Sequence, residues 1–149
     1  MAILKILVEG DPILRKKAQP IPKITKRIKD LAKDMLETMY YAKGVGLAAP
    51  QIGVSERLVV IDVGDGPHFL VNPQIINREG QQRDVEGCLS IPGRNEYVTR
   101  AEKVTVTAQN LEGKNIKIEG AGLLAVAFQH EIDHLDGILF IDYLTKEQK

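Results

Sequence analysis

The sequence predicts an α+β fold, and three patterns along the chain support this prediction. Near the N-terminus, apolar residues recur at intervals of three and four, which is the period of an amphipathic helix. In the middle of the chain, apolar and polar residues alternate, as they do in half-buried strands. Near the C-terminus, a stretch that is apolar all round indicates a buried helix. We therefore expect short antiparallel sheets packed around this buried C-terminal helix, together with an N-terminal amphipathic helix.

The amphipathic helix is predicted over residues 24–41, and Gly44 is expected to end it. A helix with such a pattern buries one stripe and leaves its charged face in water. The residues of the stripe are Ile24, Ile28, Leu31, Met35, Leu36 and Met39.

Four strands are predicted between the two helices, and residues 57–63 and 69–76 form the first two. The third and fourth strands alternate apolar with polar residues. Their apolar positions are Val104, Val106 and Ala108 in one strand and Ile116 and Ile118 in the other. The polar segment Glu112–Asn115 contains a glycine and predicts a hairpin turn between them.

The C-terminal helix begins with six consecutive apolar residues, 123–128. Ile132 and Leu135 continue the pattern, and Gly137 stands where a left-handed C-cap would fall. A helix of this composition belongs inside the protein.

The same helix carries His130, Glu131 and His134. Residues four apart lie on one face of a helix, so both imidazoles can bind a single metal ion. Glu131 directly follows His130 on the helix. Its carboxylate is therefore close enough to move a proton on a metal-bound water without binding the ion. This pattern is typical of metal-dependent hydrolases. The alternative is two ordinary histidines, exposed or in the core, on a helix without a metal.

A catalytic site usually has three protein ligands, so a third is needed. No histidine follows His134, and the only downstream glutamate, Glu147, lies among polar C-terminal residues. Upstream, the single cysteine, Cys88, follows Gly87 in a segment typical of a loop or strand end where the backbone approaches another group closely. The alternative for an isolated cysteine is an inert buried thiol.

Three sequence blocks together resemble the peptide deformylase family, whose members remove the N-formyl group from nascent chains beginning with formylmethionine and release formate. The blocks are Gly44-Val45-Gly46-Leu47-Ala48-Ala49-Pro50-Gln51, Glu86-Gly87-Cys88-Leu89-Ser90 and Gln129-His130-Glu131-Ile132-Asp133-His134. The last block alone is moderately specific, whereas the three in this order and spacing are highly specific. Weaker similarity extends over nearly the whole chain, so we expect residues 1–149 to form one catalytic domain.

The resemblance implies a metal held by Cys88, His130 and His134. Two imidazoles and a thiolate accept zinc readily, and the general affinity order places zinc above ferrous iron. Deformylases, however, commonly work with iron. The resemblance therefore implies one Fe²⁺ per chain, which Zn²⁺, Ni²⁺ or Co²⁺ can replace.

The resemblance also implies the catalytic groups. Glu131 would take a proton from the attacking water and pass it to the leaving nitrogen, while the Gln51 side chain and the backbone N–H of Leu89 would donate to the formyl oxygen. The backbone of the glycine-rich blocks would pair with the substrate peptide as an added strand, and an apolar pocket would take the methionine side chain. The substrate-binding residues are then Val45, Gly46, Gly87, Leu89, Val126 and Ala127.

Five further residues are weaker candidates. Glu86 and Arg100 either pair and orient the cysteine loop or are unrelated surface charges. Asp133 either accepts from a ligand imidazole or faces solvent. His68 is expected to be a strand-end histidine, and Ser90 lacks a free histidine and acid to activate it as a nucleophile.

Composition limits the partners. Basic and acidic residues balance at 20 each, so direct binding of DNA is not expected. No run of 18 apolar residues occurs, so no membrane span is expected either. Nothing at the start is typical of a signal peptide, which favours the cytoplasm. We expect a monomer in transient contact with the ribosome. Docking through a long C-terminal helix, which many bacterial deformylases have, is not expected of a chain that stops at Lys149.

Two other functional classes stay open from the residues alone. A zinc-dependent endopeptidase would share the histidine motif but would need a third ligand other than Cys88. A metal-stabilised binding module would normally need four protein ligands, and only three good candidates are visible.

Overall fold

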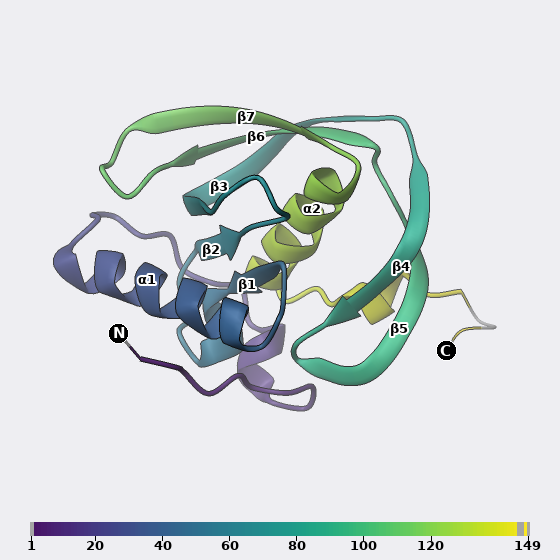
Figure 1. The fold of residues 1–149 in the computed structure, drawn as a ribbon, viewed down its shortest axis with the longest axis horizontal. Helices are drawn as coiled ribbons and strands as arrows, with labels where there is room; N and C mark the ends of the chain where they lie inside the picture. Colours follow the sequence, from purple (N-terminus) through teal and green to yellow (C-terminus); the bar gives the residue numbers. More distant parts are fainter. Residues whose placement is uncertain (1, 146–147, 149) are drawn as a thin grey trace.

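The computed structural model describes residues 2–145 and 148, and Figure 1 shows their arrangement. The fold is α+β, with two α-helices and antiparallel sheets, so the predicted fold class is confirmed. The helices are α1 (Lys26–Tyr41) and α2 (Leu123–Leu135), with short 3₁₀ helices η1 (Pro12–Arg15), η2 (Ala49–Ile52) and η3 (Phe140–Tyr143). The strands are β1 (Gly46–Ala48), β2 (Leu58–Ile61), β3 (His68–Glu79), β4 (Gln82–Cys88), β5 (Ile91–Arg100), β6 (Lys103–Gln109) and β7 (Asn115–Ala121).

The strands form two sheets. The larger has the order β1-β2-β3-β6-β7, and every neighbouring pair is antiparallel. The smaller consists of β4 and β5, which form a long antiparallel hairpin. In Figure 1 this hairpin curves along one side of the molecule, with α2 near the centre.

Strand β2 lies between the two helices and explains the long apolar run at residues 57–63. All four of its residues are buried. Leu58 and Val60 pack with the apolar stripe of α1, while Val59 and Ile61 pack with α2. A strand that is buried on both faces does not need to alternate apolar with polar residues. It ends at Ile61, two residues earlier than the pattern predicts.

Helix α1 begins two residues later than predicted. The hydroxyl of Thr25 accepts a hydrogen bond from the backbone N–H of Ile28 at 3.4 Å, so Thr25 is the N-cap and Ile24 precedes the helix. The helix ends at Tyr41, and Lys43 then turns the chain with a φ of 60°. Ile24 still packs against the α1 side of the core, which is why the apolar period includes it.

The predicted hairpin between the third and fourth strands is confirmed as β6–β7. Gln109 pairs with Asn115, so Asn115 belongs to β7 rather than to the turn. The Asn110 side chain accepts from the backbone N–H groups of Glu112 and Lys114 and closes the loop. Strands β1, β4 and β5 were not predicted as strands, and β3 extends three residues beyond its predicted end at Ile76.

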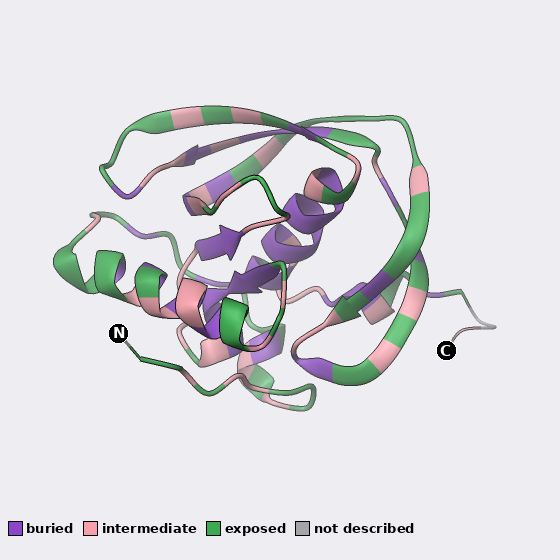
Figure 2. Cartoon of the chain, viewed as in Figure 1, coloured by how far each residue is buried: buried purple, intermediate pink, exposed green. Residues whose placement is uncertain are grey.

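Helix α2 is buried along most of its length, as Figure 2 shows. Its residues pack with β2 and β6 in one apolar cluster. Gly137 follows the C-cap with a φ of 74°, and a Cβ there would lie 2.5 Å from the carbonyl oxygen of Arg15. This close approach and the left-handed backbone both require glycine. Among the described residues, no helix is long and apolar enough to cross a membrane.

Candidate metal centre

The three predicted metal ligands lie together. His130 and His134 come from one face of α2, and Cys88 is the last residue of β4. Their candidate ligand atoms all lie within 4.8 Å of one another, and the Cys88 Sγ is 3.3 Å from the His134 Nε2. Both histidines are buried.

The donor set fits a divalent transition-metal ion. The Nδ1 of His130 is 3.0 Å from the Glu86 Oε1, which leaves its Nε2 as the candidate ligand atom. That Nε2 is 3.9 Å from the Glu131 Oε2. The other Glu131 oxygen, Oε1, is buried and has no hydrogen-bond partner among the described residues. Imidazole and thiolate ligands beside a buried, incompletely paired carboxylate are typical of a metal site.

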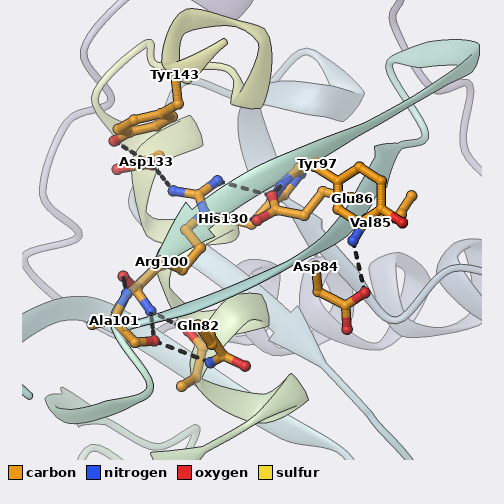
Figure 3. Close-up of polar contacts among 12 residues, drawn as sticks. Gln82, Asp84, Val85, Glu86, Tyr97, Arg100, Ala101, His130, Asp133 and Tyr143 are labelled. Atoms are coloured by element: carbon orange, nitrogen blue, oxygen red, sulfur yellow. Dashed lines mark hydrogen bonds and ion pairs between the residues drawn. The ribbon is translucent and has the colours of Figure 1, made fainter. Parts of the chain in front are cut away.

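Behind His130 lies a network of charged side chains, drawn in Figure 3. The Arg100 Nε and Nη2 donate to the two carboxylate oxygens of Glu86 at 2.8 and 2.9 Å. The pairing of Glu86 with Arg100 is thereby confirmed. Asp133 was expected to accept from a ligand imidazole or to face solvent. Among the described residues it has no hydrogen bond to an imidazole, and its side chain is only 14% exposed. It accepts from the Arg100 Nη1 at 2.7 Å and from the Tyr143 hydroxyl at 2.8 Å.

Burial and neighbouring charges shift the pKa values in the site. Burial raises the pKa of Glu131 to about 7. Burial and the positive charges of His130 and Arg100 lower the pKa of His134 well below its usual value. Burial also acts to lower the pKa of His130, but Glu131, Cys88 and Glu86 outweigh it and raise that pKa to about 10. The carboxylates of Glu86 and Glu131 thus lie close to the two nitrogens of the His130 ring, an arrangement that favours positive charge there.

The cluster opens into a cavity of about 440 Å³. Two of the candidate ligands, Cys88 and His130, line it, whereas His134 does not. Glu131 and Gln51 also line it, as does every predicted substrate-binding residue: Val45, Gly46, Gly87, Leu89, Val126 and Ala127. Sequence reasoning did not include Val85, Leu123 and Asn95, which lie on the same cavity. No periodic signal identifies them, because they come from an unpredicted hairpin and from the first turn of α2.

The Gln51 side chain is buried, and hydrogen bonds hold both ends of its amide. Its Oε1 accepts from the backbone N–H of Ala48 at 2.9 Å, and its Nε2 donates to the Ser90 Oγ at 3.0 Å. The same Nε2 is 3.6 Å from the Cys88 Sγ. An amide N–H group thus lies beside the candidate ligand, and Ser90 helps to hold it there.

Because Gly46 has no side chain, β1 can pass close to the carboxylate of Glu131, the candidate catalytic base. A Cβ at this position would lie 2.5 Å from the Glu131 Oε2. Real Cβ atoms do not approach a carboxylate so closely, so any side chain at residue 46 would displace Glu131. This contact is the physical reason for a glycine in the first sequence block.

Comparison with known proteins decides the family. A family model described as polypeptide deformylase matches residues 3–149. The chain belongs to the peptide deformylase family. It is 54% identical over 148 residues to a peptide deformylase from Halothermothrix orenii, with 98% of this chain and 96% of that protein covered. It is also 59% identical over 146 residues to a peptide deformylase from Acetivibrio thermocellus, and this match covers 98% of this chain and 86% of that protein.

A solved structure of a peptide deformylase from Legionella pneumophila is similar throughout, with a TM-score of 0.95 and 50% identity. The match covers 99% of this chain and 89% of that one. Membership of this hydrolase family favours the deformylase interpretation over an endopeptidase or a binding module. The alternative downstream glutamate, Glu147, lies outside the described residues. His68 begins β3, as expected of a strand-end histidine.

Proposed function

We propose that this chain is a single catalytic domain that removes the N-formyl group from the N-terminal formylmethionine of newly made polypeptides and releases formate. One observation carries the proposal. The cluster of Cys88, His130 and His134 adjoins Glu131 and Gln51 at a cavity with glycine-containing backbone in its wall. The activity named for the relatives agrees with this arrangement.

We assign Cys88, His130 and His134 as the ligands of one Fe²⁺, with Zn²⁺, Ni²⁺ or Co²⁺ as substitutes. The bound cation would supply a Lewis acid and a water that is nucleophilic near neutral pH. Glu86 orients His130 through its Nδ1, which keeps the Nε2 free to bind.

The protein groups handle protons and charge. Glu131, close to the His130 Nε2 and not itself needed as a ligand, takes a proton and delivers it to the departing amine. The Gln51 Nε2 and the backbone N–H of Leu89 donate to the formyl oxygen as negative charge develops on it. The fixed orientation of Gln51 supports this role, because its carbonyl end is already occupied by Ala48.

The substrate enters as an extended peptide. The backbone at Val45, Gly46, Gly87 and Leu89 pairs with it as with an added strand, which reads the peptide without reading most side chains. Val126 and Ala127, on the α2 wall of the cavity, contact the methionine side chain. We place this activity in the cytoplasm, in a monomer that meets nascent chains with at most transient ribosome contact and binds neither DNA nor a membrane.

The test is formate release from a formyl-Met peptide by metal-loaded protein, with acetyl-Met peptide as the control substrate and metal analysis of the same sample. We expect the formyl peptide to be cleaved and the acetyl peptide to be cleaved poorly, because the extra methyl group must fit between the metal and Gln51. Cys88→Ser should lose metal, since a hydroxyl is a much poorer ligand than a thiolate for these ions. Similar rates on both peptides, or full metal occupancy in Cys88→Ser, would contradict the proposal.

A further inference from the structure

The side chains behind His130 form a continuous series that ends on the 3₁₀ helix η3. We propose that Tyr143 is a positioning residue for the metal ligand His130 and acts through Asp133, Arg100 and Glu86. This inference rests on the proposed function, because it assigns a role within the same site. Figure 3 shows the residues of the series.

The series alternates donors and acceptors. The Tyr143 hydroxyl donates to Asp133, and Asp133 also accepts from the Arg100 Nη1. Arg100 donates through its other two nitrogens to Glu86, and Glu86 accepts from His130. A carboxylate can only accept, so the Nδ1 of His130 carries a proton, and the Nε2 is the nitrogen left to bind a metal ion. The series therefore fixes the tautomer that a metal ligand needs.

Tyr143 contacts this series in two ways. Besides its hydrogen bond to Asp133, its ring lies over the Arg100 guanidinium, with 4.6 Å from the Cζ to the ring centroid. The side chains of Arg100 and Glu86 are each only 4% exposed. Arg100 therefore has carboxylates at its edges and an aromatic face above it. These partners together restrict the orientation of the guanidinium, and Tyr143 contributes both to its face and, through Asp133, to its edge.

A second observation connects η3 with His130. Phe140, at the other end of η3, stacks on the His130 ring with 6.1 Å between centroids and 27° between planes. Phe140 is itself buried, with Leu139 and Leu144, against Ile91 and Val98 of β5. One short helix thus holds His130 both by direct packing and through the polar series.

Tyr143 is separate from the substrate cavity. It does not line the cavity that contains Glu131 and Gln51, and lies instead on another cavity together with Arg100 and Asp133. A change at Tyr143 should therefore alter the metal site and the rate of the chemical step, while substrate binding stays the same.

The experiment uses two variants and one matched control. Tyr143→Phe removes only the hydroxyl, and Tyr143→Leu also removes the ring over Arg100. Tyr97→Leu is the control, because Tyr97 is similarly exposed and likewise carries an arginine, Arg83, at 5.6 Å from its ring. That pair lies on the β4–β5 surface and has no hydrogen bond to the series among the described residues.

The readouts are Co²⁺ affinity, the visible absorption of the Co²⁺ form, and KM and kcat for a formyl-Met peptide. We expect Tyr143→Leu to bind Co²⁺ about tenfold more weakly, the low end of the loss seen when outer partners of metal ligands are removed. The absorption bands should shift and kcat should fall, with KM unchanged. Tyr143→Phe should show the same changes to a smaller extent, and Tyr97→Leu should show none.

Co²⁺ affinity and absorption need no turnover, so they test Tyr143 even in a protein that fails to release formate. If Tyr143→Leu does not fold, Tyr143→Phe decides, since it keeps the ring. Unchanged Co²⁺ affinity and absorption in the folded Tyr143 variants would overturn the proposal. Equal changes in Tyr97→Leu would overturn it too, because they would come from a general loss of surface packing.

Discussion

In the β6–β7 hairpin, the residues that face the core are apolar, whereas the β4–β5 hairpin turns Glu86 and Arg100 inward. The first hairpin pairs in one register from Lys103 opposite Ala121 to Gln109 opposite Asn115. The second changes register between Gly87 and Cys88. The hairpin that carries the candidate ligand Cys88 therefore buries charged side chains and interrupts its pairing, while the other is built by regular apolar packing. The two hairpins are thus held in place by different kinds of interaction, buried ion pairs in one and apolar packing in the other.

The largest expected effect comes from removing the proposed base. Glu131→Gln should lower kcat by roughly 100- to 10,000-fold, the contribution of general acid–base groups, while metal content stays the same. The measurement is formate release together with metal analysis. Near-normal turnover in this variant would show that Glu131 is not the base, and that the reaction does not depend on this part of the cavity.

The second-largest effect is a loss of stability, and it is expected when the buried charge of Arg100 in β5 is removed. Arg100→Leu leaves the Glu86 carboxylate buried without its cation, and removing one partner of a buried ion pair typically costs about 3 to 5 kcal/mol of unfolding free energy. Metal affinity should fall as well, because Glu86 no longer holds His130 in place. Urea denaturation of the metal-free protein and a Co²⁺ titration measure the two effects.

The matching change in the regular hairpin is Val106→Ala. Val106 is buried in the cluster with α2, so the loss should be about 2 kcal/mol, from two methylene equivalents and a small cavity. Co²⁺ affinity should not change. Should this variant weaken Co²⁺ binding as much as Arg100→Leu does, the contrast between the two hairpins would be wrong.

The smallest effect compares two glycines with positive φ. Gly113 (φ 81°) lies in the β6–β7 loop and Gly93 (φ 79°) in β5, and a Cβ added at either would meet nothing within 4 Å. Alanine at each should cost about 1 kcal/mol of stability from the left-handed backbone alone. Only Gly93 lines the cavity, so only Gly93→Ala should raise KM for a formyl-Met peptide. Equal KM values in both variants would place Gly93 outside the peptide path.

The elements that the sequence predicts well are those held by apolar packing. The stripe of α1, the run that becomes β2 and the alternation of β6 all arise from residues that bury hydrocarbon against a helix. The boundaries differ where a local hydrogen bond decides them, as at the Thr25 cap. Strands β4 and β5 were not predicted, because the residues that they bury include Glu86 and Arg100. Charged residues in a sequence do not indicate a buried position.

In the candidate site too, the sequence predicts some residues and misses others. Spacing on a helix brings His130 and His134 together, and the resemblance supplies Cys88 from a distant strand end. Tyr143 gave no signal, because its contact with Arg100 exists only once β5 and η3 have packed. A tyrosine near the end of a chain has no spacing rule that would connect it with a metal ligand.

The contact between Gly137 and Arg15 has a consequence for the order of folding. The Arg15 guanidinium donates to the Gly137 carbonyl, and the Ala18 backbone N–H donates to the carbonyl of Leu135, the last residue of α2. Arg15 also binds Asp142 at a separation of 127 residues. Contacts between such distant residues require closure of a long loop, which slows folding. During synthesis, the end of α2 therefore cannot be held by Arg15 and Ala18 until residues 135–137 have left the ribosome.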